Sequence, residues 1–421
     1  MKDTTKFIVV FTLCVLQVVI VIGALNWFVD PYSIHRSSPE NPRQPVWMSK
    51  QLRIAKALYV NKITPRGIVI GASTAQLAID PSHPGWDNEI QPRYNLAMPG
   101  ANMYENLRFY QHARANAPLK QVLLGLDFVA FNHFTPLSDD FKESLIASDK
   151  DGKTKSSLLL KMAMPLLSLN AVTASQKKVF ARRKETHWAN GREIPEETGK
   201  RDWRAAMLGS ADGYVTRLLL PPPSHRFCLE DSSIPGSALG QLETLLRTAA
   251  MDGTDIRLFI QPSHAFLLEA LQAAGYWDDY EKWERKLVGL IDKINTEVSP
   301  EKKILLWDFS GYSAFTGEAV GKDNATVMKW YWDAGHYKKD LGDRVQDRIF
   351  GYDSPDRNGT ENFGALIDVN NIDSHLKNTA KKRSAYLETQ HENIQELKTR
   401  ISNSIKNISP YDCSRIKGNR F

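Results

Sequence analysis

Five short apolar runs alternate with segments of helical periodicity, and this alternation limits the fold more than any other feature of the chain. Each run is four to six residues long and is bounded by turn-forming residues. Short apolar strands that alternate with helices indicate a parallel sheet covered by helices on both faces. We therefore predict an α/β fold. The predicted strands are 67–70, 94–97, 121–126, 256–260 and 304–307, and the predicted helices are 50–61, 104–115, 236–250, 265–275 and 277–298.

The N-terminal segment 7–29 contains 23 residues without a charge. At about 1.5 Å per residue, a helix of this length crosses the hydrocarbon core of a bilayer. Lys2 and Lys6 precede it, and Trp27 lies at its far end, as is typical of a membrane interface. We predict a single-pass anchor in the cytoplasmic membrane, with the bulk of the chain outside it, in the periplasm. The alternative is a cleaved signal peptide, although the apolar run is longer than the usual 7–15 residues, roughly, of such a peptide.

The rest of the chain divides into a connector, an α/β domain and a tail. An insertion at about 136–235 interrupts the strand–helix rhythm, and we interpret it as a lid or a partner surface with a helix over 157–183. The tail has apolar residues every seven positions over 372–405, which indicates a helix packed on the domain or, less strongly, a coiled coil. The predicted parts are 1–29 (cytoplasmic tip and anchor), 30–65 (connector and helix), 66–365 (α/β domain) and 366–421 (helical tail).

Composition excludes several classes of function. The net charge of +6 is spread over 421 residues without a dense basic block, so nucleic acid is not an expected partner. The chain has neither of the glycine-rich phosphate-binding motifs of nucleotide-binding folds. Among its three cysteines, Cys14 lies in the apolar span, and Cys228 and Cys413 are hypothesised to form a disulfide. No Cys/His spacing indicates zinc, so we predict neither a metal nor a cofactor.

Residues capable of chemistry follow the predicted strands. Ser73 follows the first strand, Gly100 the second, Asp127 the third, His264 the fourth and Asp308 the fifth. In an open parallel sheet, ligands bind beyond the carboxyl ends of the strands. We therefore expect a functional site at this edge.

An Asp-x-x-His motif near the end of the domain supplies a candidate base. The Asp333 carboxylate is expected to hold one ring nitrogen of His336 and fix its tautomer, which leaves the other nitrogen to accept a proton from a hydroxyl. Ser73 is the predicted hydroxyl. The competing interpretation is structural: Ser73 would be a helix N-cap, and Asp333 would cap a helix that begins near Gly335.

Three further residues are candidates for substrate binding: Asp127, Trp332 and His264. Two of them have a structural alternative. Trp332 belongs to an aromatic cluster that is more often core packing than a sugar platform, and His264 is more often a buried structural histidine.

These motifs together resemble those of the SGNH/GDSL hydrolase family. Gly71-Ala72-Ser73 is similar to the family's nucleophile turn, the YNLAMPGAN stretch that contains Gly100 to its glycine block, and Asp333-Ala-Gly-His336 to its terminal motif. The resemblance implies a flavodoxin-like three-layer sandwich with a central parallel sheet. It also implies a Ser73 nucleophile, a His336 base oriented by Asp333, and an oxyanion held by the N–H groups of Ser73 and Gly100.

The family's third block departs from its usual pattern in this chain. It is usually Gly-x-Asn-Asp, with the Asn side chain as an oxyanion donor, but here Asp127 stands in the Asn position. An ionised Asp127 would repel the oxyanion, and loss of one donor costs roughly 10²–10³ in rate. Three explanations are open: Asp127 is protonated or aimed elsewhere, Asn102 or Asn132 supplies the donor, or the activity is weak.

The layout of one N-terminal span, an early serine and a late Asp-x-x-His is similar to the membrane-anchored DltD-like branch and to exported polysaccharide O-acetyltransferases. This similarity implies an extracytoplasmic serine acyltransferase or esterase that acts on a cell-envelope polysaccharide or polymer. The implied partners are the glycan or acyl donor, the membrane, and a membrane-bound O-acyltransferase. The alternative is a catalytically degenerate SGNH-like scaffold that binds a glycan or such a membrane partner.

Overall fold

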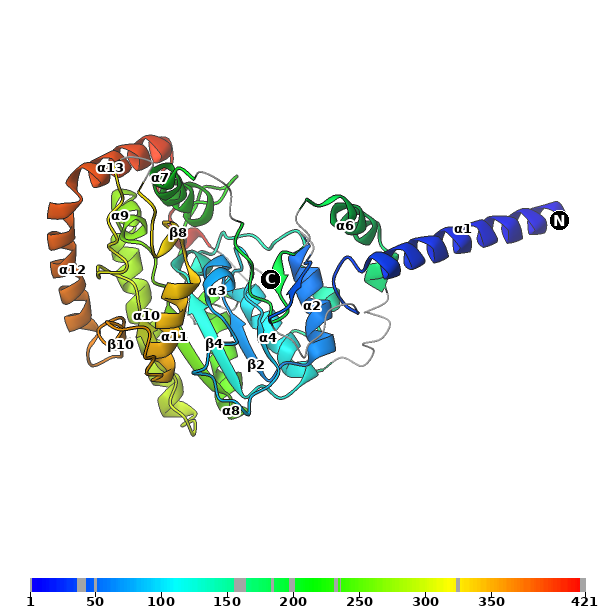
Figure 1. Ribbon diagram of the computed structural model, residues 1–421, viewed down its shortest axis with the longest axis horizontal. Coiled ribbons are helices and arrows are strands. Elements are labelled where there is room, and N and C mark those ends of the chain that lie inside the picture. The colour runs from blue at the N-terminus through cyan, green and yellow to red at the C-terminus, as the bar shows by residue number, and fades with distance from the viewer. Residues whose placement is uncertain are drawn as a thin grey trace.

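The domain is built around a mixed sheet of six strands in the order β10-β7-β6-β4-β2-β3 (Figure 1). The computed structural model of the protein describes residues 2–35, 43–48, 51–154, 164–182, 185–196, 201–230, 234, 236–322 and 326–416. The strands are β2 (Gly67–Ile70), β3 (Arg93–Asn95), β4 (Gln121–Leu126), β6 (Asp255–Ile260), β7 (Leu305–Asp308) and β10 (Ala365–Ile367).

The five predicted strands are confirmed and are parallel to one another. The prediction of a wholly parallel sheet is wrong, because β10 adds an antiparallel edge beside β7. This strand is only three residues long and follows a turn-rich stretch, so its sequence carries no clear strand pattern. The central strands β2 and β4 are buried along their whole length, which explains their continuous apolar sequences.

The strand order determines where a site can form. Counted by position in the chain, the parallel strands have the spatial order 2-1-3-4-5, which is that of flavodoxin-like doubly wound sheets. The direction of the connections reverses between β2 and β4, and ligands bind at such a switch point, beyond the carboxyl ends of the strands. Ser73 follows β2 and Asp127 follows β4, so both lie at this point.

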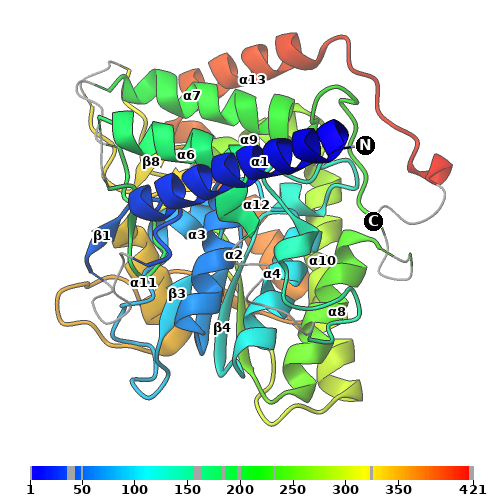
Figure 2. The same cartoon turned by 90° about the vertical axis from the view of Figure 1, so that its right-hand side faces the viewer.

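Helices cover both faces of the sheet (Figures 1 and 2). One layer contains α4, α8 and α10, with α2 packed beside α4, whereas α3 and α11 lie on the opposite face. The five helices predicted alongside the strands are confirmed, with small shifts at their ends: they are α2 (Leu52–Ile63), α4 (Met103–Asn116), α8 (Ala238–Met251), α9 (Ala265–Ala273) and α10 (Trp277–Glu297). The helices α3 (Ser73–Ala78) and α11 (Lys339–Phe350) are not among the predicted elements.

The insertion adds no strand to the central sheet in its described part. The helix predicted over 157–183 is confirmed only in its C-terminal half, as α6, which begins after Ser168, whose hydroxyl accepts the Ala171 N–H. Residues 155–163 lie outside the described residues. From residue 164 on, the described elements of the insertion are η3 (Met164–Leu167), α6 (Leu169–Phe180), β5 (His187–Trp188), α7 (Trp203–Gly213) and the π-helical η4 (Tyr214–Leu219). The strand β5 pairs with β1 (Pro45–Val46), which lies in the connector.

The N-terminal helix α1 (Lys2–Val29) projects from the domain (Figure 1). It is long and apolar enough to cross a membrane, and its apolar side chains are exposed. The last turns of α1 pack against α6. The buried Asn26 amide donates to the Leu166 carbonyl at 2.6 Å, and its oxygen accepts from the Ser175 hydroxyl at 2.8 Å.

The C-terminal tail packs on the domain, as the favoured interpretation of its sequence predicted. It forms two helices, α12 (Ile372–Thr389) and α13 (His391–Ile405), because the predicted single helix breaks at Gln390. α13 packs against α9 and α7 through buried apolar side chains. The Cys228–Cys413 disulfide is confirmed. The remaining short elements are η1 (Phe128–Phe131), η2 (Glu143–Leu145), β8 (Tyr331–Asp333), β9 (His336–Tyr337) and η5 (Cys413–Arg415).

Candidate active site

Ser73 is positioned by a sharp turn at the end of β2. Gly71 has φ +145°, and a Cβ there would lie 2.9 Å from the Gly125 carbonyl oxygen on β4, so a side chain does not fit. The N-cap of α3 is Ala72, and Ser73 is the first residue of the helix. The interpretation of Ser73 as an N-cap is therefore wrong, and its hydroxyl is available for another contact.

That contact is with the late histidine. Ser73 Oγ lies 2.8 Å from His336 Nε2. His336 Nδ1 lies 2.9 Å and 3.0 Å from the two carboxylate oxygens of Asp333. The three groups thus stand in the order hydroxyl, imidazole, carboxylate, which is the arrangement that activates a serine through an adjacent base.

A two-residue hairpin between β8 and β9 holds the histidine and the carboxylate side by side. Asp333 and His336 face each other across this hairpin. Asp333 Oδ1 also accepts the N–H groups of Gly335 at 2.9 Å and His336 at 3.1 Å, which fixes the carboxylate in the turn. The alternative in which Asp333 caps a helix is wrong, because α11 begins only at Lys339. β9 packs on α3, and this contact brings the imidazole to Ser73.

The electrostatics suit a base. Burial lowers the pKa of His336, but the hydrogen bond and charge of Asp333, together with the charges of Asp127 and Glu193, outweigh it and raise the pKa above its usual value. Burial raises the pKa of Asp333, but hydrogen bonds from His336 and from the backbone of the turn outweigh this effect and lower it. Asp333 is therefore ionised when His336 carries a proton.

Asp127 faces the same cavity from the end of β4. Its carboxylate accepts a hydrogen bond from the Thr74 hydroxyl at 3.0 Å. Burial raises the pKa of Asp127 to about 6, while the Thr74 hydrogen bond and the His336 charge oppose that rise. The carboxylate is thus engaged with Thr74, and it cannot donate a hydrogen bond to an oxyanion while it is ionised.

The amide groups of Asn102 and Asn132 are engaged in the scaffold. Asn102 caps α4: its oxygen accepts the Glu105 N–H at 3.0 Å, and its nitrogen faces the Thr135 carbonyl at 3.3 Å. Asn132 donates to the carbonyls of Leu219 and Arg226 at 2.8 and 2.9 Å. Neither asparagine belongs to the cavity lining, so the oxyanion role predicted for Asn102 is not assigned to it.

Gly100 occupies the position expected of an oxyanion donor. It lies in the turn after β3 with φ +62°, is exposed, and lines the cavity with Ser73. Among the residues that the structure describes, none accepts a hydrogen bond from the Gly100 N–H. The N–H of Ser73 lies in the first turn of α3, where backbone N–H groups have no acceptor within the helix. The N–H groups of Gly100 and Ser73 are therefore the two candidate donors to an oxyanion.

A cavity of about 310 Å³ opens beside Ser73 and His336. Its walls come from the strand ends and from the insertion, which supports the interpretation of the insertion as a cover over the site. Sequence reasoning missed Arg53, Tyr214 and Arg217, which have no motif of their own and reach the cavity only through tertiary packing. The lining from the insertion is Pro136, Leu137, Ser138, Tyr214, Arg217, Leu218, Pro221 and Pro222.

His264 and Trp332 lie outside this cavity lining. His264 is fully buried at the N-terminus of α9, where Nδ1 accepts the Phe266 N–H and Nε2 faces the Glu318 carbonyl at 2.8 Å. Burial lowers the pKa of His264 to about 4, as expected of a structural histidine. Trp332 stacks on Trp203 with ring centres 6.4 Å apart. Neither arrangement supports the binding role that the sequence suggested.

No protein-family model matches the chain, and no curated protein matches its sequence. The resemblance to the SGNH/GDSL pattern therefore stays a proposal. Function has to be inferred from the geometry and chemistry of the cavity.

Proposed function

We propose that the protein is a membrane-anchored serine enzyme of SGNH type that transfers or hydrolyses O-acyl groups on a cell-envelope polysaccharide or polymer. The observation that carries this proposal is the contact of Ser73 with His336 and of His336 with Asp333, at 2.8 and 2.9 Å, beside a cavity at the switch point of the sheet. Three side chains separated by up to 263 positions meet in the order that activates a hydroxyl.

In the proposed reaction, Ser73 Oγ attacks the acyl carbonyl carbon while its proton passes to His336 Nε2. The resulting oxyanion accepts hydrogen bonds from the backbone N–H groups of Ser73 and Gly100. Collapse breaks the bond to the leaving alcohol, which takes the proton from His336, and an acyl-serine ester remains. His336 then removes a proton from a sugar hydroxyl or water, which attacks the ester and restores Ser73.

The cavity suits an acyl group. Apolar side chains from η1, η4, α9 and the loop after η1 form much of its wall, and its volume is near the lower end of ligand pockets, roughly 300–1,000 Å³. Arg217, which is exposed, lies in the lining and supplies a positive charge for an anionic part of the donor or acceptor. The apolar wall residues are Val129, Leu137, Leu218 and Leu267.

Two features support a location outside the cytoplasmic membrane. A disulfide between Cys228 and Cys413 persists in oxidising compartments and is rare in the cytosol. The helix α1 offers an apolar span, and α6 packs across its last turns near the expected membrane surface. In this arrangement the enzyme works beside the bilayer, where a membrane-bound O-acyltransferase is the proposed source of the acyl group.

Asp127 favours a second candidate function, a scaffold without turnover. Its carboxylate lies at the site, in the position where the family pattern has an asparagine donor, and its ionised form opposes an oxyanion. In that case the same cavity binds an acylated glycan or a membrane partner without cleaving a bond.

Acyl release separates the two candidates. The full-length chain in detergent is expected to release acetate from an activated aryl ester, and Ser73→Ala is expected to lose this activity. The matched control is Ser263→Ala, a serine that also lines the cavity but makes no contact with His336 among the described residues. Equal rates for the wild type and Ser73→Ala would refute the enzymatic proposal, and glycan binding that survives Ser73→Ala would then favour the scaffold.

A further inference from the structure

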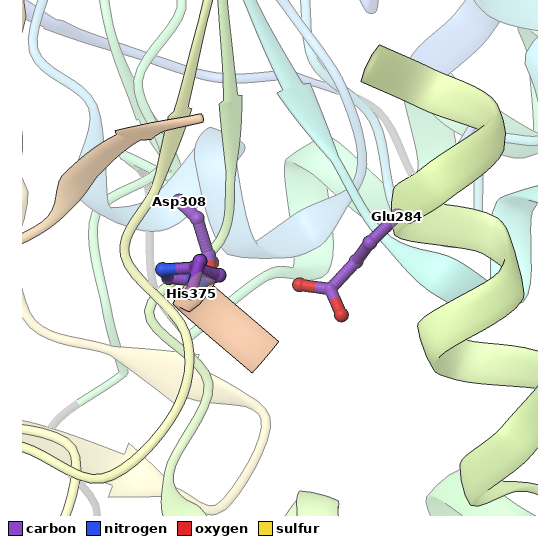
Figure 3. A group of neighbouring side chains, drawn as sticks. All are labelled: Glu284, Asp308 and His375. Atoms are coloured by element: carbon purple, nitrogen blue, oxygen red, sulfur yellow. The ribbon is translucent and has the colours of Figure 1, made fainter. Parts of the chain in front are cut away.

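Another histidine–carboxylate cluster lies away from the cavity, where the sequence predicted no metal. Glu284 on α10, Asp308 at the end of β7 and His375 on α12 place one ligand atom each within 4.8 Å of one another (Figure 3). Figure 3 shows the Glu284 carboxylate pointing toward Asp308 and His375. The three residues come from three separate elements, so tertiary packing alone brings them together.

The described residues around the buried Glu284 carboxylate give it no compensating contact. Its side chain is 2% exposed, yet no described residue forms a hydrogen bond or ion pair with it. Its sequence neighbour Arg285 pairs instead with Asp373. A buried carboxylate without a partner is costly, and proteins either protonate it or supply a cation.

The other two groups already make one favourable contact. His375 Nε2 lies 2.6 Å from Asp308 Oδ2, and Asp308 Oδ1 accepts the Ser310 N–H at 2.8 Å. A divalent ion between the three groups would place a positive charge beside both carboxylates and take the imidazole nitrogen as a ligand.

We propose that Glu284, Asp308 and His375 bind one divalent transition-metal ion of the zinc class. Zinc binds carboxylate oxygens and imidazole nitrogens in proteins, and the imidazole disfavours magnesium and calcium. Ligands of one tetrahedral zinc ion at about 2.1 Å lie roughly 3.4 Å apart, so Asp308 Oδ2 and His375 Nε2, which are 2.6 Å apart, have to separate by about 0.8 Å. All three ligand atoms already lie within 4.8 Å of one another.

The site joins α10 and α12 to the end of β7. Its strand β7 lies two strands away from β4 and three from β2, the strand that Ser73 follows. Metal binding is therefore expected to stabilise the packing of the C-terminal helices on the sheet. It is not expected to take part in the chemistry at Ser73.

Zinc stoichiometry and thermal unfolding test the proposal on the full-length chain in detergent. After EDTA treatment and removal of the chelator, added zinc is expected to bind at about one equivalent per chain and to raise the unfolding temperature by several degrees. Glu284→Gln and His375→Ala are expected to lose both effects. The control Asp292→Asn, an exposed acid on the same helix, is expected to behave as the wild type.

Two results would overturn the proposal. One is zinc binding that is equal in the wild type and Glu284→Gln, which would locate the ion elsewhere. The other is a wild type that binds no zinc and is less stable than Glu284→Gln, which would show that Glu284 is simply a buried, protonated acid. Glu284→Gln preserves size and shape, so it keeps the test valid even if His375→Ala fails to fold.

Discussion

Two of the aspartate–histidine pairs among the described residues have similar contacts and different surroundings. In the Asp333–His336 pair, the imidazole is 31% exposed and its second nitrogen meets the Ser73 hydroxyl beside the cavity. In the Asp308–His375 pair, the imidazole is 16% exposed, and the third neighbour is the buried carboxylate of Glu284. An Asp–His contact therefore does not define a function by itself.

The third group and its access to solvent decide what each pair can do. A hydroxyl beside a cavity can give up a proton and attack a substrate. A second buried carboxylate cannot attack a substrate as a hydroxyl can, but it adds the negative charge that a metal requires. We therefore expect substitutions in the first pair to affect activity and those in the second to affect stability.

The largest contrast is expected between the two histidines. His336→Ala removes the proposed base for Ser73 and is expected to lower kcat by about 10⁶-fold, as in serine proteases that lose their catalytic histidine. His375→Ala is expected to leave kcat within about threefold of the wild type, because it does not contact the cavity lining. Steady-state ester hydrolysis by both variants measures this contrast, and comparable losses in the two would contradict it.

The two aspartates sharpen the comparison. Asp333→Asn keeps the size of the side chain but favours the wrong tautomer of His336, and it is expected to lower kcat by about 10⁴-fold. Asp308→Asn in the second pair is expected to have little effect on kcat. An Asp333→Asn enzyme with nearly full activity would show that the carboxylate does not orient the base.

Stability is expected to show the reverse order. Asp308→Asn leaves His375 without its charged partner and is expected to lower the free energy of unfolding by about 3 kcal/mol. Asp333→Asn retains an oxygen for the backbone N–H groups of its turn and is expected to cost less than half of that. Denaturant unfolding of the two variants measures both losses of unfolding free energy. A larger loss for Asp333→Asn than for Asp308→Asn would contradict this order.

The smallest effect is expected in the pH dependence. His336 must be neutral to accept a proton, so kcat/KM rises as the pH rises through its pKa, which Asp333 and Asp127 hold above the usual value. Asp127→Asn removes one of these negative charges, so the pKa falls and the midpoint moves to lower pH by about half a unit. A pH–rate profile measures the shift, with Asp292→Asn as the control, and a shift to higher pH would contradict the assignment.

Sequence reasoning recovered the parts of the molecule that local patterns encode. The continuous apolar sequences of β2 and β4 reflect full burial, and the small residues before Ser73 reflect a turn in which a Cβ at Gly71 does not fit. It could not find β10, whose three residues are ordered mainly by pairing with β7.

The candidate site was predicted only in part for a similar reason. Ser73, Asp333 and His336 carry recognisable spacing, whereas Arg53, Tyr214 and the Glu284 cluster depend on which elements pack together. The role suggested for Asn102 shows the limit of motif matching, since its position after β3 serves to cap α4. The packing of the elements, and not the spacing of residues along the chain, therefore determines these parts of the sites.

Covalent labelling of Ser73 tests the central claim most directly. A serine-directed fluorophosphonate incubated with the full-length chain is expected to form one adduct per chain, located on the peptide that contains Ser73 by mass spectrometry. His336→Ala is expected to slow the labelling strongly, and His375→Ala is expected to leave it unchanged. A wild-type chain that forms no adduct on Ser73, or that is labelled equally fast without His336, would contradict the assignment of an activated serine.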